Sequence, residues 1–147
     1  MILACGNTAF NPNVKIVGGK PADPNSWPAQ VFILNIISGI YSIGSYGNYR
    51  VTQAYSCGGT LIDANTVLTA AHCLTQTMDV SLYGQTYTLN VKNPLDPTQY
   101  SVYIGAHNIS FLSTGGAIPY PTVKMSVQTV IRVSKLFNTN HNINVYK

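Results

Sequence analysis

Two neighbouring blocks of sequence decide the fold: Ser56–Ile62 (SCGGTLI) and Val67–Cys73 (VLTAAHC). The apolar and β-branched runs in these blocks predict two strands, and Asp63-Ala64-Asn65 between them predicts a tight turn. His72 and Cys73 follow directly after the second run. The blocks therefore predict a strand–turn–strand unit that leads into an imidazole, a group that titrates near neutral pH.

The rest of the chain carries further strand signals. Strands are predicted at Gln30–Ile37, Ser101–Ala106 and Val123–Val133, and no segment keeps a 3.6-residue apolar period long enough to predict a helix. Turn-forming residues predict a long surface loop at Ser38–Tyr55, an irregular loop or extra hairpin at Thr75–Gln99, and a break at Gly115–Pro121. Short strands separated by turns predict an all-β barrel or sandwich.

The composition narrows the class of protein. The chain has 147 residues, which fits one domain, and 46% of them are hydrophobic, which is enough for a core. Charged residues make up 8%, against about 25% in ordinary soluble domains, and the ten tyrosines argue against disorder. The basic residues behind the net charge of +4 are never adjacent, so no nucleic-acid partner is expected. No apolar run reaches the roughly 20 residues that span a bilayer, so no membrane span is expected.

The cysteine count is odd. Cys57 and Cys73 lie sixteen positions apart, and Cys5 stands alone. In a secreted protein a lone Cys has a partner elsewhere or is a reactive thiol, whereas in a cytosolic protein all three would be reduced thiols. No Cys/His spacing indicates a metal site, so no metal and no other cofactor is expected.

The two opening blocks resemble the trypsin/chymotrypsin-like serine proteases (peptidase S1), in which CGGTLI, a turn and VLTAAHC carry the catalytic His. Three more stretches agree in order and rough spacing. Lys15–Gly19 (KIVGG) resembles the zymogen activation site, Ser26–Val31 (SWPAQV) the block before the first strand, and Val102–Asn108 (VYIGAHN) a later strand. The resemblance runs from about Cys5 to Lys147, with departures at the two long loops.

The resemblance implies a fold and a domain organisation. Family members have a double six-stranded antiparallel β-barrel with the active site between the barrels. This chain would supply mainly the N-terminal barrel. Residues 1–15 would be a propeptide-like segment, and residues 16–147 an incomplete trypsin-like protease domain.

The resemblance also implies roles for individual residues. His72 would be the general base of a serine endopeptidase, and Cys57 and Cys73 would form the disulfide beside it. Cleavage between Lys15 and Ile16, by an activating protease with trypsin-like preference, would convert a zymogen into the mature protein, with Cys5 disulfide-bonded to a partner outside this chain. Secretion follows from the same resemblance, and Asn108-Ile109-Ser110 is then a glycosylation sequon. The substrate would be a protein or peptide. His107 and His141 are expected to be surface residues.

Two blocks of the family pattern are not found. The catalytic Asp lies in a block like NDIALL, expected just beyond Lys147, and the catalytic Ser lies in GDSGGP. After His72 the only Asp residues are Asp79 and Asp96, and neither has the family's sequence context. The chain is therefore expected to be a fragment, inactive alone, and poorly soluble because it would expose an apolar face.

Two alternative functions compete with the endopeptidase. A non-catalytic serine-protease homologue would act as an extracellular binding protein, and an altered Asp or Ser in the complete protein would identify it. A small extracellular β-barrel binding module unrelated to proteases would fold well alone. The KIVGG stretch argues against this last alternative.

Overall fold

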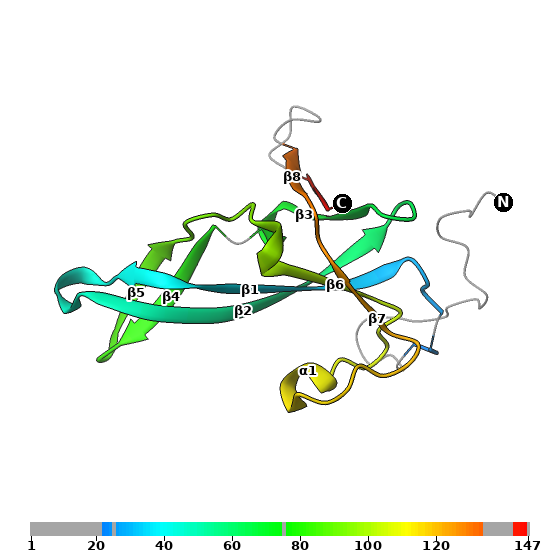
Figure 1. The fold of residues 1–147 in the computed structure, drawn as a ribbon, viewed down its shortest axis with the longest axis horizontal. Coiled ribbons are helices and arrows are strands. Elements are labelled where there is room, and N and C mark those ends of the chain that lie inside the picture. Colours follow the sequence, from blue (N-terminus) through cyan, green and yellow to red (C-terminus); the bar gives the residue numbers. More distant parts are fainter. Residues whose placement is uncertain (1–21, 25, 75, 134–142, 147) are drawn as a thin grey trace.

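The computed structural model describes residues 22–24, 26–74, 76–133 and 143–146. Within these residues it consists of antiparallel strands, one short α-helix and three single 3-10 turns (Figure 1). The strands are β1 Gln30–Ser42, β2 Asn48–Leu61, β3 Val67–Ala70, β4 Thr77–Leu82, β5 Gln85–Asn90, β6 Tyr100–Ile104, β7 Val123–Ser126, β8 Val130–Val133 and β9 Ile143–Tyr146. The helical turns are η1 Gly44–Tyr46, η2 Ala71–Cys73, η3 Pro97–Gln99 and α1 Phe111–Thr114. The all-β prediction is confirmed.

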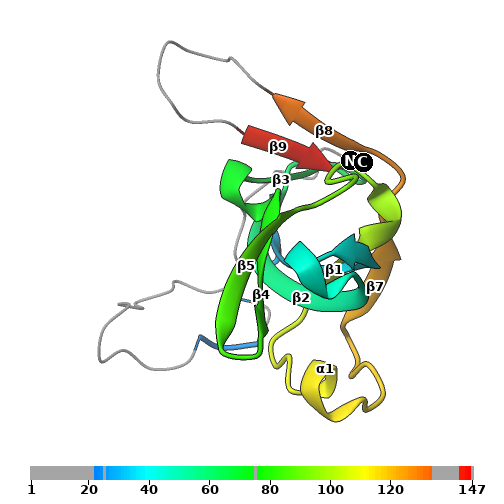
Figure 2. The ribbon, with the colours of Figure 1, turned by 90° about the vertical axis from the view of Figure 1, so that its left-hand side faces the viewer.

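Seven of the described strands form one sheet in the order β7-β6-β1-β2-β3-β9-β8, while β4 and β5 form a second sheet. The edge strands β7 and β8 are joined by residues 127–129 alone. A flat sheet of this size would separate its edges by about 29 Å, since neighbouring strands lie about 4.8 Å apart. The extended chain from Ser126 to Val130 reaches only about 14 Å. The sheet must therefore curl as the wall of a barrel does, and Figure 2 shows β8 and β9 above β1 and β2, where β9 pairs along the whole of β3.

The segment Ser38–Tyr55 is not a loop, which corrects the sequence-based prediction. β1 continues to Ser42 and pairs in unbroken register with β2, from Gln30 opposite Thr60 to Ser42 opposite Asn48. The Gly and Ser residues suggested a loop, but Ile, Tyr, Val and Thr between them favour strands. Only the tip is a turn, where Gly44 and Gly47 have φ of 50° and 91°.

The turn predicted at Asp63–Asn65 and the hairpin predicted within Thr75–Gln99 are both present, whereas the strand predicted at Val123–Val133 is divided. Asp63 Oδ1 accepts the Asn65 N–H at 2.9 Å, which closes the turn between β2 and β3. The Thr75–Gln99 segment contains the extra hairpin, β4 and β5, which turns at Tyr83-Gly84 with both residues at positive φ. The predicted strand Val123–Val133 is two strands, because the chain turns Val127 into the core between them.

The buried side chains form two clusters. The proximal core lies under the β1–β6 part of the main sheet: Val31, Ile33, Val67, Leu74, Tyr100, Val102, Val127 and Val130. The distal core lies where the long β1–β2 hairpin meets β4–β5: Ile37, Tyr41, Ile43, Val51, Met78 and Val91. The second hairpin therefore covers the inner face of the first one, and Figure 1 shows the two hairpins side by side.

The helical content is small. α1 has four residues and buries Phe111 against Tyr103 of β6, with ring centroids 5.6 Å apart. Across the part of the chain that the structure describes, no helix combines the length and the apolar character needed to cross a bilayer.

Candidate active site

His72 is placed by the end of β3 and the turn that follows it. Val67 and Thr69 point into the protein, and the Thr69 hydroxyl donates to the Gly58 carbonyl of β2 at 2.6 Å. The chain then turns through η2, where the Leu74 N–H donates to the Ala71 carbonyl at 3.1 Å. Leu74 is buried, whereas His72 is exposed on the turn. The imidazole is thus held on an anchored backbone and is accessible to another molecule.

Cys57 and Cys73 form the predicted disulfide, with their Cα atoms 5.8 Å apart. The bond ties the end of β2 to η2 immediately after His72. Closing a loop of this length stabilises the folded state by about 3 kcal/mol in the chain-entropy model. The disulfide therefore restrains the backbone that carries the imidazole.

The glycines next to Cys57 serve the packing of this region. A Cβ on Gly59 would lie 2.9 Å from Val67 Cγ1, 3.0 Å from Ile33 Cδ1 and 3.1 Å from the Leu68 carbonyl oxygen. These distances are too short for carbon atoms in contact. A residue without a side chain at this position lets β3 approach β1 and β2 closely, so Gly59 is part of how His72 is positioned.

A cavity of about 180 Å³ adjoins His72. It is lined by residues of β1, β2 and η2: Ile33, Asn35, Tyr55, Ser56, Cys57, His72 and Cys73. Burial, with a smaller effect of the negative charge on Asp79, raises the pKa of the Tyr55 hydroxyl, which donates to Gln53. Among the described residues, the cavity wall carries no carboxylate and no ammonium group.

Asn35 is a residue of this cavity that sequence reasoning missed. It is 2% exposed, and neither polar atom of its carboxamide has a hydrogen-bond partner among the described residues. Its signal in the sequence was a lone polar residue within the apolar run Val31–Ile37.

No described acidic side chain lies in the cavity wall with His72. Asp79 accepts from the Thr88 hydroxyl at 2.6 Å on the β4–β5 hairpin. Asp96 caps η3, and hydrogen bonds from Thr98 lower its pKa. β9 pairs with β3 directly before the imidazole, with Ala70 opposite Ile143, and its sequence Ile-Asn-Val-Tyr contains no acid.

The ligand atoms of Cys57, His72 and Cys73 lie within 4.8 Å of one another, a grouping that can hold a metal ion. Zinc binds cysteine as the thiolate. The disulfide joins both sulfurs, so in this oxidised form the group offers only the imidazole as a free ligand.

Some of the remaining predicted site residues lie within the part of the chain that the structure describes, and others lie outside it. Lys15, Ile16, Cys5 and His141 lie outside the described residues. Asn108 is exposed, and its Oδ1 accepts the Ser110 N–H at 2.8 Å. His107 is exposed, as predicted.

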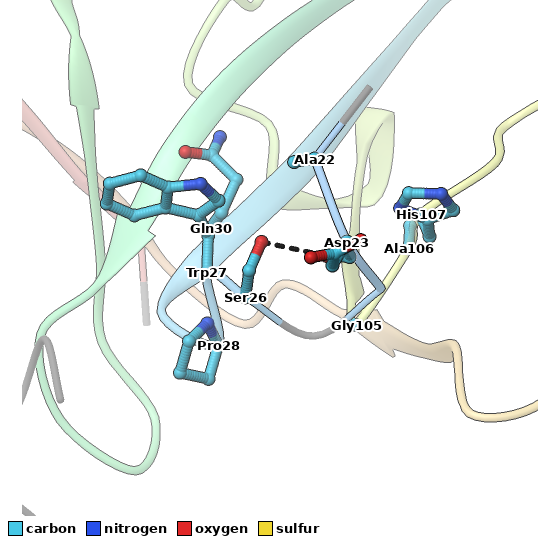
Figure 3. Close-up of a pocket in the computed structure, with 9 residues that line it drawn as sticks. All are labelled: Ala22, Asp23, Ser26, Trp27, Pro28, Gln30, Gly105, Ala106 and His107. Atoms are coloured by element: carbon cyan, nitrogen blue, oxygen red, sulfur yellow. Dashed lines mark hydrogen bonds between the residues drawn. The ribbon is translucent and has the colours of Figure 1, made fainter. Parts of the chain in front are cut away.

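His107 belongs to a separate hollow of about 190 Å³ beside the start of β1. Figure 3 shows its imidazole and the Trp27 ring on opposite sides of the hydrogen bond from the Ser26 hydroxyl to the Asp23 carbonyl, which measures 2.8 Å. This hollow shares no lining residue with the cavity at His72. The two sites are therefore distinct.

Comparison with known proteins adds to this geometry. The model of the family described as Trypsin matches residues 16–117, a range that includes β1 to β6 and the His72 turn. This chain belongs to the trypsin family. The Cys57–Cys73 disulfide, which the sequence blocks predicted, is therefore a feature of a trypsin-family chain.

Relatives within the trypsin family are similar over most of this chain. Chymotrypsin-C of Rattus norvegicus is 37% identical over 91 residues, which are 60% of this chain and 30% of the relative. Chymotrypsin-C of Bos taurus is 33% identical over 108 residues, 72% of this chain and 34% of the relative. Chymotrypsin-like elastase family member 1 of Macaca fascicularis is 33% identical over 129 residues, 88% of this chain and 34% of the relative. The chain thus spans about a third of the length of these relatives.

Proposed function

We propose that this chain supplies the general base, His72, of a secreted serine endopeptidase. The observation that carries the proposal is an exposed imidazole on a turn that the Cys57–Cys73 disulfide fixes. A neutral imidazole can take the proton of a Ser hydroxyl and return it to the leaving amine. The substrate is a protein or peptide, as the names of the relatives suggest.

The nucleophile and the orienting acid come from outside the described site. A Ser without a base, or a base without a Ser, leaves amide hydrolysis about 10⁶-fold slower. The 147-residue chain is therefore inactive alone and acts as part of a larger endopeptidase.

Activation occurs by cleavage between Lys15 and Ile16 in the KIVGG stretch. A Lys before the cut directs an activating protease with trypsin-like preference to this bond. Treatment of the wild-type chain with such a protease, followed by N-terminal sequencing, is expected to give a new terminus at Ile16. A Lys15→Gln variant should remain uncut there, and cleavage elsewhere in both proteins would contradict the assignment.

Secretion agrees with the disulfide, since such bonds persist in oxidising compartments. Asn108 is exposed at a sequon and is then a glycosylation site. Protein from a eukaryotic secretory host should lose mass on treatment with an N-glycosidase, and the Asn108→Gln variant should not. Equal mass before and after treatment of the wild type would remove this site from the proposal.

A second candidate function is the non-catalytic homologue that acts as an extracellular binding protein. The observation that favours it is the pairing of β9 with β3 beside His72, because β9 brings no carboxylate to this position. The residue that precedes β9 in the sequence is Asn142, which lies outside the described residues. This second candidate assigns Asn142 to the position of the orienting carboxylate, in place of a block beyond Lys147, and an amide there lowers turnover about 10⁴-fold.

One experiment separates the two candidates. The native transcript is sequenced past the codon for Lys147, and the complete activated protein is assayed on a panel of peptide amides. The endopeptidase proposal expects turnover that falls about 10⁶-fold in His72→Ala and stays unchanged in the surface control His107→Ala. Absence of turnover in the wild type, with turnover gained in Asn142→Asp, would support the non-catalytic homologue. Equal activity of wild type and His72→Ala would remove the general-base role.

A further inference from the structure

The buried carboxamide of Asn35 needs a partner that the protein does not provide. Asn35 lies on the inner face of β1, between Ile33 of the proximal core and Ile37 of the distal core. Its Oδ1 and Nδ2 atoms are both buried without a hydrogen bond to any group in the part of the chain that the structure describes. An unsatisfied buried polar group destabilises a fold by about 1–3 kcal/mol per group, so a native protein rarely keeps one without a ligand.

The space that this carboxamide meets is the cavity at His72. Its volume of about 180 Å³ far exceeds the roughly 10–15 Å³ that one water molecule requires. The wall also includes His72, so a molecule inside has polar groups of both Asn35 and His72 within the same lining. A buried water makes about three hydrogen bonds in sites of this kind. The site thus matches a small neutral molecule that both donates and accepts hydrogen bonds.

We propose that ordered water in this cavity connects the Asn35 carboxamide to the His72 imidazole, which makes Asn35 a positioning residue for His72. The carboxamide both donates and accepts, so it can fix the orientation of the water. That water then presents an oriented partner to the imidazole. Because none of the described residues in the cavity wall carries a carboxylate or an ammonium group, none of them competes with the water for His72.

The positioning role rests on the proposed function, but the hydration does not. If His72 is a general base, an oriented partner favours one tautomer and one ring orientation, as the second shell of a catalytic imidazole does. If the chain is a binding protein, the same water still satisfies Asn35. The test is therefore made on the imidazole and the carboxamide directly, without an activity assay.

The first measurement uses isotope-labelled wild-type chain with the disulfide formed. Nuclear Overhauser transfer between water and the Asn35 side-chain NH₂ is expected to have the sign of a long-lived contact. The half-buried Gln53 amide serves as an internal comparison outside the cavity wall, because it donates to the Asp79 carbonyl at 2.6 Å and accepts from the Tyr55 hydroxyl. A transfer no larger for Asn35 than for Gln53 would overturn the proposal.

The second measurement is the pKa of His72, followed by NMR in two variants of Asn35. Asn35→Asp places a carboxylate where the water can transmit its charge, and it is expected to raise the pKa of His72 by about one unit. Asn35→Leu keeps a similar volume but removes the polar anchor, so it is expected to lower the pKa of His72 because the cavity becomes drier.

A matched control is Asn48→Asp at the exposed start of β2, which should leave the pKa of His72 unchanged. Unchanged His72 titration in both Asn35 variants, or an Asn35→Leu variant that is more stable than wild type with unaltered titration, would show that the carboxamide is dry and unconnected to His72. Failure here leaves the endopeptidase proposal intact, since that proposal is tested by hydrolysis in the complete protein.

Discussion

The adjacent glycines Gly58 and Gly59 differ in how much space a side chain would have at each position. A Cβ on Gly58 would meet only the Gln30 side-chain nitrogen, at 3.1 Å, and that flexible side chain can move. A Cβ on Gly59 would meet two core side chains and the backbone of β3. Gly59→Ala is therefore expected to lower the free energy of unfolding by about 1–3 kcal/mol, as overpacking of a core does. Urea denaturation measures this, with Gly58→Ala as the control, and equal losses would contradict the packing argument.

The buried Tyr100 gives the chain an alkaline limit. Its hydroxyl donates to the Pro94 carbonyl at 2.8 Å, and burial, with the negative charge of Asp96, raises its pKa from 10.0 to about 12. Between these values the unfolded chain loses the proton and the folded chain keeps it, so stability falls as the pH rises. Below pH 10 the Tyr100 hydroxyl is protonated in both states, and its full contribution to the free energy of unfolding is present.

Tyr100→Phe is expected to reduce this alkaline loss of stability. At pH 7 the variant should be less stable by about 1 kcal/mol, because the Pro94 carbonyl loses its donor. Above pH 10 the difference between variant and wild type should shrink. Denaturation at several pH values provides the measurement, and parallel curves up to pH 12 would contradict the assigned shift.

At the scale of elements, the β1–β2 hairpin depends on the β4–β5 hairpin for its core. Ile37 is 1% exposed in the distal core, whereas its neighbour Ile36 is 46% exposed on the opposite face of β1. Ile37→Ala should lower the free energy of unfolding by about 3 kcal/mol, since it removes a buried side chain and leaves a cavity. Ile36→Ala, the matched control, should lower it by less than about 1 kcal/mol. Similar losses would mean that the distal core contributes nothing to the cooperative fold.

The disulfide links β2 to η2, and its loss is expected to change the free energy of unfolding of the whole chain. Replacing both Cys57 and Cys73 with Ser is expected to lower the free energy of unfolding by about 3 kcal/mol, because the unfolded chain regains loop entropy. Denaturation of the variant against oxidised wild type measures the loss. An unchanged midpoint would contradict a stabilising role.

Local sequence decided some elements and not others. The turn at Asp63–Asn65 was predictable because its hydrogen bond is made between residues two positions apart. The Ser38–Tyr55 strands were not, because their apolar side chains are buried by Met78 and Val91, which come much later in the chain. The disulfide and His72 came from the family blocks, whereas the position of Asn35 beside His72 depends on three elements that meet only in the fold.

At the scale of the whole molecule, two features favour self-association: the unpaired edge of β7 and the low content of charged residues. β7 pairs with β6 alone among the described strands, and its Val123 and Met125 are 52% and 49% exposed. Exposed apolar edge strands are templates for pairing with another chain, and a charged side chain blocks this. The exposed edge of β7 is therefore a candidate cause of the expected poor solubility of the isolated chain. Its effect can be tested separately from the effect of net charge.

Met125→Lys is expected to reduce self-association, measured by sedimentation velocity over a range of concentrations. The control is Thr60→Lys on β2, which adds the same charge at an exposed position whose strand is paired on both sides, with Gln30 of β1 and Leu68 of β3. If the edge of β7 drives association, only Met125→Lys shifts the chain toward monomer. An equal shift in both variants would assign association to the low net charge, and a monodisperse wild-type monomer at high concentration would refute the predicted association altogether.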